Sequence, residues 1–295
     1  MAHGQLAWPH TWRFHAGGGC DIVPAARSHT ETLNRQEFNP VFIRFVEQTQ
    51  TSTQREAAVA IVPLAAVETH GPHLPLATDG LIVEGILDQA GKNDGSPSAY
   101  VRLPMLWLGA STEHADRPGT LSIEPEQLIG QIVAIAEGLS RCGIHRVVLF
   151  NGHGGNVAAA AIAALKLRTR FEMLVASAHW LDFGLPAGLV PPAPLTGDVH
   201  GGWVETAAML HLAPRLVVKG AMAARPATAP APSLFPQGPI AWGWKLDDLA
   251  ADQGDAGGWI GRADLATAEL GKSLVDHAAA ALLRLLQEIS TAQWP

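Results

Sequence analysis

Three short segments of this sequence gather the residue types that bind metal ions. They are ETHGPHLPLATD at residues 68–79, NGHGGN at 151–156 and HGGWVET at 200–206. Their imidazole and carboxylate groups make a mixed nitrogen and oxygen donor set, which suits zinc or manganese better than a soft, cysteine-rich site would. The ligands that this pattern predicts are Glu68, His70, Asp79, His153 and Glu205.

A ligand set of this size predicts two metal ions per chain. Asp79 lies at the expected start of a helix, where the helix dipole stabilises a carboxylate that can bridge two cations. Two ions about 3.5–4 Å apart can hold a water between them as a nucleophile near neutral pH. We therefore expect two divalent ions, zinc or manganese or both, with iron as a further possibility.

The first two segments each follow a short apolar run that is typical of a buried parallel strand. The runs are AAVAIVPLAAV from Ala57 and RVVLF at residues 146–150. In parallel sheets, ligands bind beyond the carboxyl ends of the strands. If the first strand continues through Glu68 and His70, its period of two places both side chains on one side.

The third segment places a carboxylate on an otherwise apolar helix face. Glu205 shares that face with Ala208, Met209 and Leu212 at i+3, i+4 and i+7. Burying an unpaired carboxylate costs several kcal/mol, so Glu205 needs a compensating partner, and a cation supplies one.

Strand-like and helix-like segments alternate along the rest of the chain. This order predicts an α/β fold built from right-handed strand–helix–strand units. Its mostly parallel sheet is expected to be covered by helices on both faces. Further strands are expected over residues 101–108, 146–150 and 173–178. Helices are expected over residues 80–90, 125–142, 157–167, 202–212 and 264–289, the last as one helix or as a pair.

Two segments carry no such pattern. Residues 1–45 mix Gly, Pro, His and Arg without a helical or strand period, and we expect an N-terminal arm or a subunit-contacting extension before a hydrolase domain over residues 46–295. The Pro-rich stretch at residues 224–239 is expected to be a loop that folds over the site or reaches a neighbouring subunit.

Composition and charge argue against several classes of protein. The 295 residues carry a net charge of −7, and Lys and Arg stand singly, so no basic surface for nucleic acid is expected. Only two cysteines occur, without metal-finger spacing, which fits a reducing cytoplasm. The sequence contains no run of about 18 consecutive apolar residues, so no membrane span is expected.

From about Ala58 to Ala281 the sequence resembles the creatininase family. The resemblance rests on the three metal-binding segments, on EHADRPGTLSI at residues 113–123 and on IGRADLATAELG near the C-terminus. It implies a three-layer α/β/α sandwich around a parallel sheet, a binuclear metal site, hydrolysis of non-peptide C–N bonds in small amides, and frequently a homohexamer.

The resemblance also implies roles for the individual ligands. Glu68 and His153 would bind one metal, His70 the other, and Asp79 would bridge them. Creatininase itself has Tyr and a ligand Glu directly after the His that matches His153, and this sequence has Gly154 and Gly155 there. Glu205 is then expected to supply the missing carboxylate.

Creatinine is not the expected substrate. Creatininase has a Trp four residues before the His that matches His200, and this sequence has Thr196. The function we expect is that of a metal-dependent amidohydrolase, in which a water bridging two metals attacks an amide or lactam carbonyl. His200 would carry a proton to the leaving nitrogen, a role that suits a group titrating near neutrality.

Several other hypotheses about the function stay open. The same site could serve a deformylase or a peptide-trimming enzyme with a wider pocket, or a non-catalytic metal-binding regulatory protein, against which His200 argues. Some residues could either support the ligands and the substrate or be purely structural. These residues are His73, His114, Asn151, Trp180 and Trp203.

Overall fold

The computed structural model describes residues 10–14, 20–24, 42–47, 58–93, 100–228, 231, 234, 236, 242–250 and 257–293. The chain forms two compact units, residues 1–39 and 40–295. In the first unit, strands β1 (His10–Phe14) and β2 (Cys20–Pro24) pair as an antiparallel hairpin. The sequence showed no strand period there, because a two-stranded hairpin depends on backbone pairing across a turn.

The second unit is built on a five-stranded sheet in which every described pairing is parallel. The strand order is β3-β5-β4-β6-β7, so the first strand of this unit, β3, lies at one edge. Because β3 belongs to the sheet, the unit begins before residue 46. The strands are β3 (Phe42–Arg44), β4 (Val59–Leu64), β5 (Tyr100–Arg102), β6 (Arg146–Asn151) and β7 (Leu174–His179).

The central strands are apolar on both faces because helices cover both. In β4, Val59 and Ile61 pack into one hydrophobic cluster, whereas Ala60 and Val62 pack into another. This alternation is the side-chain period of two in a strand. The predicted buried parallel strands are therefore confirmed in β4 and β6.

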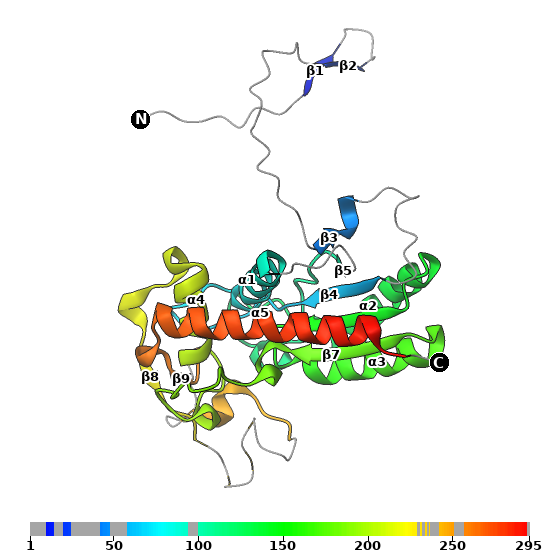
Figure 1. Cartoon of the computed structure of the whole chain (residues 1–295). Helices are drawn as coiled ribbons and strands as arrows, with labels where there is room; N and C mark the ends of the chain where they lie inside the picture. Colours follow the sequence, from blue (N-terminus) through cyan, green and yellow to red (C-terminus); the bar gives the residue numbers. More distant parts are fainter. Residues whose placement is uncertain are drawn as a thin grey trace. The chain divides into compact units, whose positions relative to one another are not determined.

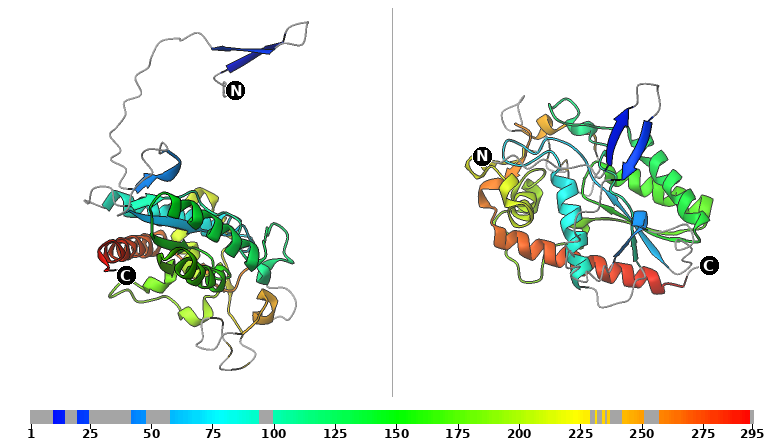
Figure 2. Two further views of the ribbon diagram at one scale, coloured as in Figure 1. Left: turned by 90° about the vertical axis from the view of Figure 1, so that its right-hand side faces the viewer. Right: turned by 90° about the horizontal axis from the view of Figure 1, so that it is seen from above.

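Helices α1, α4 and α5 pack against one another on one face of the sheet, and α2 and α3 form a pair on the other (Figure 1). Figure 2 shows α5, in red, on the opposite side of the strands from α2 and α3, in green. The predicted three-layer α/β/α architecture is confirmed. The helices are α1 (Thr78–Asn93), α2 (Pro125–Arg141), α3 (Asn156–Phe171), α4 (Trp203–Leu212) and α5 (Ala268–Thr291).

Two predicted strands end early. Strand β4 stops at Leu64 and does not continue to Glu68 and His70, because pairing with β6 ends where the amide of Gly152 donates to the Leu64 carbonyl. Strand β5 is limited to Tyr100–Arg102, and Pro104, which has no N–H to donate, separates it from an isolated parallel bridge between Leu64 and Leu106.

The end of the chain forms a single helix, not a pair. Thr267 caps α5 by accepting a hydrogen bond from the Leu270 amide, whereas Asp264 lies in the short 3-10 turn η9 (Ala263–Leu265). In the Pro-rich stretch, strand β8 (Ala224–Arg225) pairs with β9 (Gly261–Arg262). Much of that stretch lies outside the described residues, so its expected role over the site stays a prediction.

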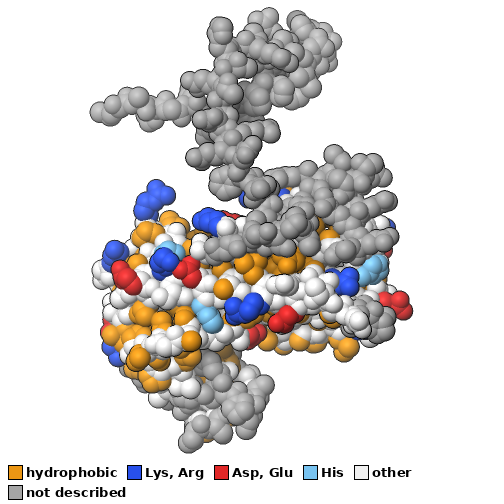
Figure 3. Space-filling view, in the orientation of Figure 1, with side chains coloured by type: hydrophobic (Ala, Val, Ile, Leu, Met, Phe, Trp, Pro, Cys, Tyr) orange, Lys and Arg blue, Asp and Glu red, His pale blue; other side chains and the backbone are white. Residues whose placement is uncertain are grey.

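The surface of the described residues is mixed in character. Figure 3 shows side chains of both charges standing among one another on the face that carries α5. Within the described part of the chain, no helix combines the length and apolarity needed to cross a bilayer.

Close packing of α5 on α4 gives a stability prediction. A Cβ added to Gly271 of α5 would clash with the carbonyl oxygen of Ala207 in α4, whereas one added to Gly130 of α2 would meet open space. We expect Gly271→Ala to lower the free energy of unfolding by about 1–3 kcal/mol through overpacking. Gly130→Ala, the matched control, should raise it by about 0.5–1 kcal/mol. Urea denaturation measures both, and equal effects would contradict the close approach.

Candidate metal centre

The three ligand segments meet beyond the carboxyl ends of β4 and β6, which are neighbours in the sheet. The loop after β4 carries Glu68 and His70, and Asp79 lies in the first turn of α1. The loop after β6 carries His153. Helix α4 brings Glu205 from a distant part of the sequence.

One group of possible ligands joins Glu68, Asp79 and His153. Atom Nδ1 of His153 lies 3.1 Å from Oε1 of Glu68 and 3.5 Å from Oδ2 of Asp79. One donor atom from each residue lies within 4.8 Å of the other two. Ligands about 2.1 Å from a tetrahedral ion are about 3.4 Å apart, so these distances are compatible with one metal ion.

A second group joins His70, Asp79 and Glu205. Atom Nε2 of His70 lies 3.2 Å from Oδ1 of Asp79 and 3.9 Å from Oε1 of Glu205. Asp79 thus presents Oδ2 to the first group and Oδ1 to the second. This is the geometry that a carboxylate bridging two ions needs.

Several buried oxygens in this cluster lack the partners that burial demands. Both carboxylate oxygens of Glu68 and Oδ2 of Asp79 are buried and accept no hydrogen bond of good geometry, although ring nitrogens lie close by. Among the described residues, no Lys or Arg forms an ion pair with either carboxylate. Leaving a charged group unsatisfied costs more than about 1–3 kcal/mol, and a cation between the donors would remove that cost. The donor set therefore fits metal ions.

The carboxylates attract positive charge strongly. Burial opposes protonation of His70, but Asp79, Glu205 and Glu68 together outweigh it and raise the pKa of His70 to about 10. Burial likewise opposes protonation of His153, but Glu68, Asp79 and Glu113 together raise the pKa of His153 to about 10. Because metal ions and protons compete for the same imidazoles, metal binding at this site should release protons.

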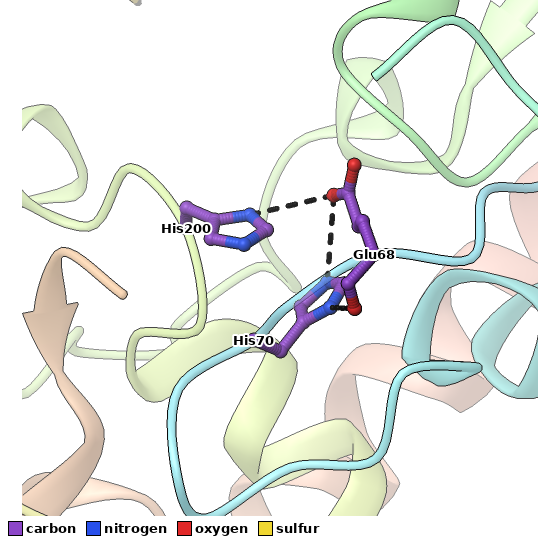
Figure 4. Close-up of side chains that lie close together, drawn as sticks. All are labelled: Glu68, His70 and His200. Carbon is purple, nitrogen blue, oxygen red and sulfur yellow. Dashed lines mark hydrogen bonds and ion pairs between the residues drawn. The ribbon is translucent and has the colours of Figure 1, made fainter. Parts of the chain in front are cut away.

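His200 lies against the same cluster, and its ring orientation can be argued from its partners. Nε2 is 2.6 Å from the carbonyl oxygen of Thr69, so Nε2 carries a proton and donates it there. Nδ1 then faces the ligands, 3.7 Å from Oε1 of Glu68 (Figure 4). Burial lowers the pKa of His200, which leaves a neutral ring whose Nδ1 can accept a proton.

The ring of His114 stacks on the ring of His200. Their ring centroids are 4.1 Å apart, and Nε2 of His114 lies 3.8 Å from Oε1 of Glu68. Glu68, His70 and His200 also form a third group with ligand spacing. The structure thus brings together all five predicted ligands, together with His200 and His114.

Asn151 and His73 bond to the backbone of the neighbouring loops and do not belong to the ligand groups. The Asn151 side chain bonds both backbone groups of His153, at 2.6 and 3.1 Å. The buried His73 lies 3.0 Å from the Gly201 carbonyl and 2.9 Å from the Thr206 hydroxyl, which fixes the start of α4. Both residues are placed to support the ligands.

Trp180 and Trp203 are not at the cluster. Both are shielded from solvent in the apolar core between the sheet and helices α1, α4 and α5. The structure therefore favours core packing for these rings over stacking on a substrate.

Three residues outside the predicted set also contribute to this region. Oγ of Ser111 and Oε1 of Glu113 lie 3.3 and 3.4 Å from Nε2 of His153. Asp198 accepts hydrogen bonds from the first amides of α4, at 2.7 and 3.0 Å, and caps the helix that carries Glu205. The available signal for Glu113 was its place directly before His114 in the EHADRPGTLSI segment.

Comparisons with known proteins point to one family. The family model described as Creatininase: Creatinine amidohydrolase matches residues 46–286. A mycofactocin precursor peptide peptidase from Mycolicibacterium smegmatis is 36% identical over 194 residues, covering 64% of this chain and 72% of that protein. A creatinine amidohydrolase from Pseudomonas putida is 31% identical over 199 residues, covering 61% and 75%.

The fold also matches solved structures. A manganese form of creatininase superposes with a TM-score of 0.63 at 24% identity, covering 85% of this chain and 100% of that one. At this identity, the likeness concerns the fold.

The second ligand group predicts a change in metal content. We expect the purified, zinc- or manganese-loaded chain to hold two ions, and Glu205→Gln to hold one, because a neutral amide is a weaker ligand than a carboxylate. Elemental analysis after gel filtration measures the ratio, with the exposed Glu288→Gln as the control and circular dichroism as the check on folding. A Glu205→Gln protein that keeps two ions would remove Glu205 from the ligand set.

Proposed function

Since the chain belongs to the creatininase family, we propose that its clustered carboxylates and imidazoles form the two-metal centre of a hydrolase that cleaves C–N bonds. Glu68 and His153 would hold one ion, and His70 and Glu205 would hold the other. Asp79 would be shared by both. The observation that carries the proposal is this sharing, with one Asp79 oxygen facing each group.

When bound, such ions polarise a scissile carbonyl and make a nearby water acidic enough to attack near neutral pH. The nitrogen and oxygen donors suit zinc or manganese. Solved creatininases include a manganese form and a Zn–Zn form. The identity of the ions in this chain, its cytoplasmic location and its assembly into a homo-oligomer such as a hexamer remain predictions, as does the N-terminal arm or extension over residues 1–45.

His200 is the proposed acid–base residue. With Nε2–H anchored on Thr69, Nδ1 takes the proton that the attacking water loses. The same atom then gives the proton to the nitrogen as its bond to the carbonyl carbon breaks. A neutral buried imidazole suits both steps, because it accepts a proton and then returns it.

His200→Ala should therefore lower turnover by about 10²-fold or more while both metal ions are retained. The matched control is His211→Ala, which removes an imidazole from the last turn of α4. Steady-state kinetics and elemental analysis on the same preparations separate the roles. Unchanged turnover would exclude His200 from the reaction, and loss of an ion would make it a ligand in the group with Glu68 and His70.

A second candidate concerns the substrate, which we propose to be a peptide or another amide larger than creatinine. A Cβ atom added at Gly154, next to His153, would meet no atom within 4 Å. Creatininase has Tyr at the matching position, so this chain has open space where that enzyme has a ring. The relative from Mycolicibacterium smegmatis is a peptide peptidase by name, which also supports a substrate larger than creatinine.

Gly154→Tyr tests whether that space is used. We expect kcat/KM for short peptides to fall by about 10-fold or more, the scale of a lost pocket contact, with a smaller effect on a small amide. Gly154→Ala, which adds one methyl group, is the control. Equal losses on both substrates would show that the space beside His153 does not select the substrate.

A further inference from the structure

Glu113 is a carboxylate of this region that no proposed role has used. It lies on the short 3-10 turn η3 (Thr112–His114), and its side chain is 13% exposed. Its Oε1 lies 3.4 Å from Nε2 of His153. The other nitrogen of that ring, Nδ1, faces Glu68 and Asp79. The imidazole of His153 therefore stands between the proposed ligand carboxylates and Glu113.

The absence of a side chain at residue 155 makes this approach possible. A Cβ on Gly155 would lie 2.5 Å from Nε2 of His153 and 2.6 Å from Oε1 of Glu113, and would also clash with the Ala110 carbonyl oxygen. Gly155 has an ordinary helical backbone, with φ −62°, so glycine is not needed for conformational freedom. Space is the reason, because the Ala110 carbonyl, the His153 ring and Glu113 together occupy the volume that a side chain here would enter.

Glu113 makes its charged contact with the ring of His153. Among the described residues, His153 is the side chain with which Glu113 forms an ion pair. Nε2 of His153 also has the Ala110 carbonyl at 3.1 Å and the Ser111 hydroxyl at 3.3 Å. Three oxygens from one short segment thus surround the nitrogen that faces away from the ligand group. A metal-binding His characteristically donates its second N–H to such oxygens, and they fix its orientation and raise its basicity.

We propose that Glu113 is a positioning residue, which together with the bare backbone at Gly155 holds His153 so that Nδ1 points at the metal ions. The proposal rests on the two-metal function above. Glu113 acts through His153 and does not touch the ions itself. Its loss should weaken metal binding more than it weakens the fold.

The test measures zinc affinity by competition with a chelator, for the full chain and for variants at this position. Glu113→Ala should weaken the binding of one zinc ion by about 10–100-fold, and Glu113→Gln, which keeps an acceptor oxygen but loses the charge, by less. The matched control is Asp116→Asn, an exposed carboxylate three residues further along the same loop. It should leave both affinities unchanged.

A second readout does not depend on activity. With cobalt(II) as the probe, the visible absorption of Glu113→Ala should differ from that of the wild type and of Asp116→Asn, because the His153 ligand is reoriented. Circular dichroism and the unfolding midpoint show whether each variant folds, and a destabilised Glu113→Ala still leaves Glu113→Gln to be measured.

The outcomes separate this inference from the proposed function. A folded Glu113→Ala with wild-type zinc affinity and cobalt spectrum would overturn the positioning role, and so would a change in KM alone, which would indicate contact with substrate. Failure of the wild-type chain to bind two ions would instead overturn the two-metal function.

Discussion

Buried negative charge is the constraint on which this site depends. Glu68 and Asp79 lie at the carboxyl end of the sheet with almost no exposure and, within the described residues, without a Lys or Arg partner. Isolated carboxylates in such a place would cost several kcal/mol each. Imidazoles and metal ions are the groups that can balance them, and four imidazoles lie within 4 Å of Glu68, those of His70, His114, His153 and His200.

The backbone around the cluster serves to hold these charges at fixed distances. Asn156 links three separate loops, because its amide bonds the Ala65 carbonyl, the Ala110 amide and the Asn151 side chain. On the other side, Glu205 depends on the position of α4, which is set by its cap at Asp198 and by close packing on α5 at Gly271. The spacing of the candidate ligands is thus a consequence of packing well outside the cluster.

Two of the differences from creatininase fall on the residues beside His153. Glu68, His70, Asp79 and His153 have counterparts in the resemblance, whereas Glu205 would replace the carboxylate that creatininase has after the matching His. Gly154 leaves open space, and Gly155 admits Glu113. An enzyme family can change its substrate when the surroundings of a shared site change, because function depends on the residues of the site and not on the fold alone. The names of the relatives, a peptide peptidase and a creatinine amidohydrolase, fit that division.

The sequence by itself determined the buried strands and the residue types of the ligands, because apolar runs and His or Glu at strand ends are local patterns. It overestimated β4 and β5, since their ends depend on where pairing with neighbours stops, at Gly152 and Pro104. Only the tertiary structure decided that Glu113 and Ser111 lie on His153 and that Trp203 is in the core. These are distances between segments far apart in the chain, and they follow from the path of loops without a period that a sequence could reveal.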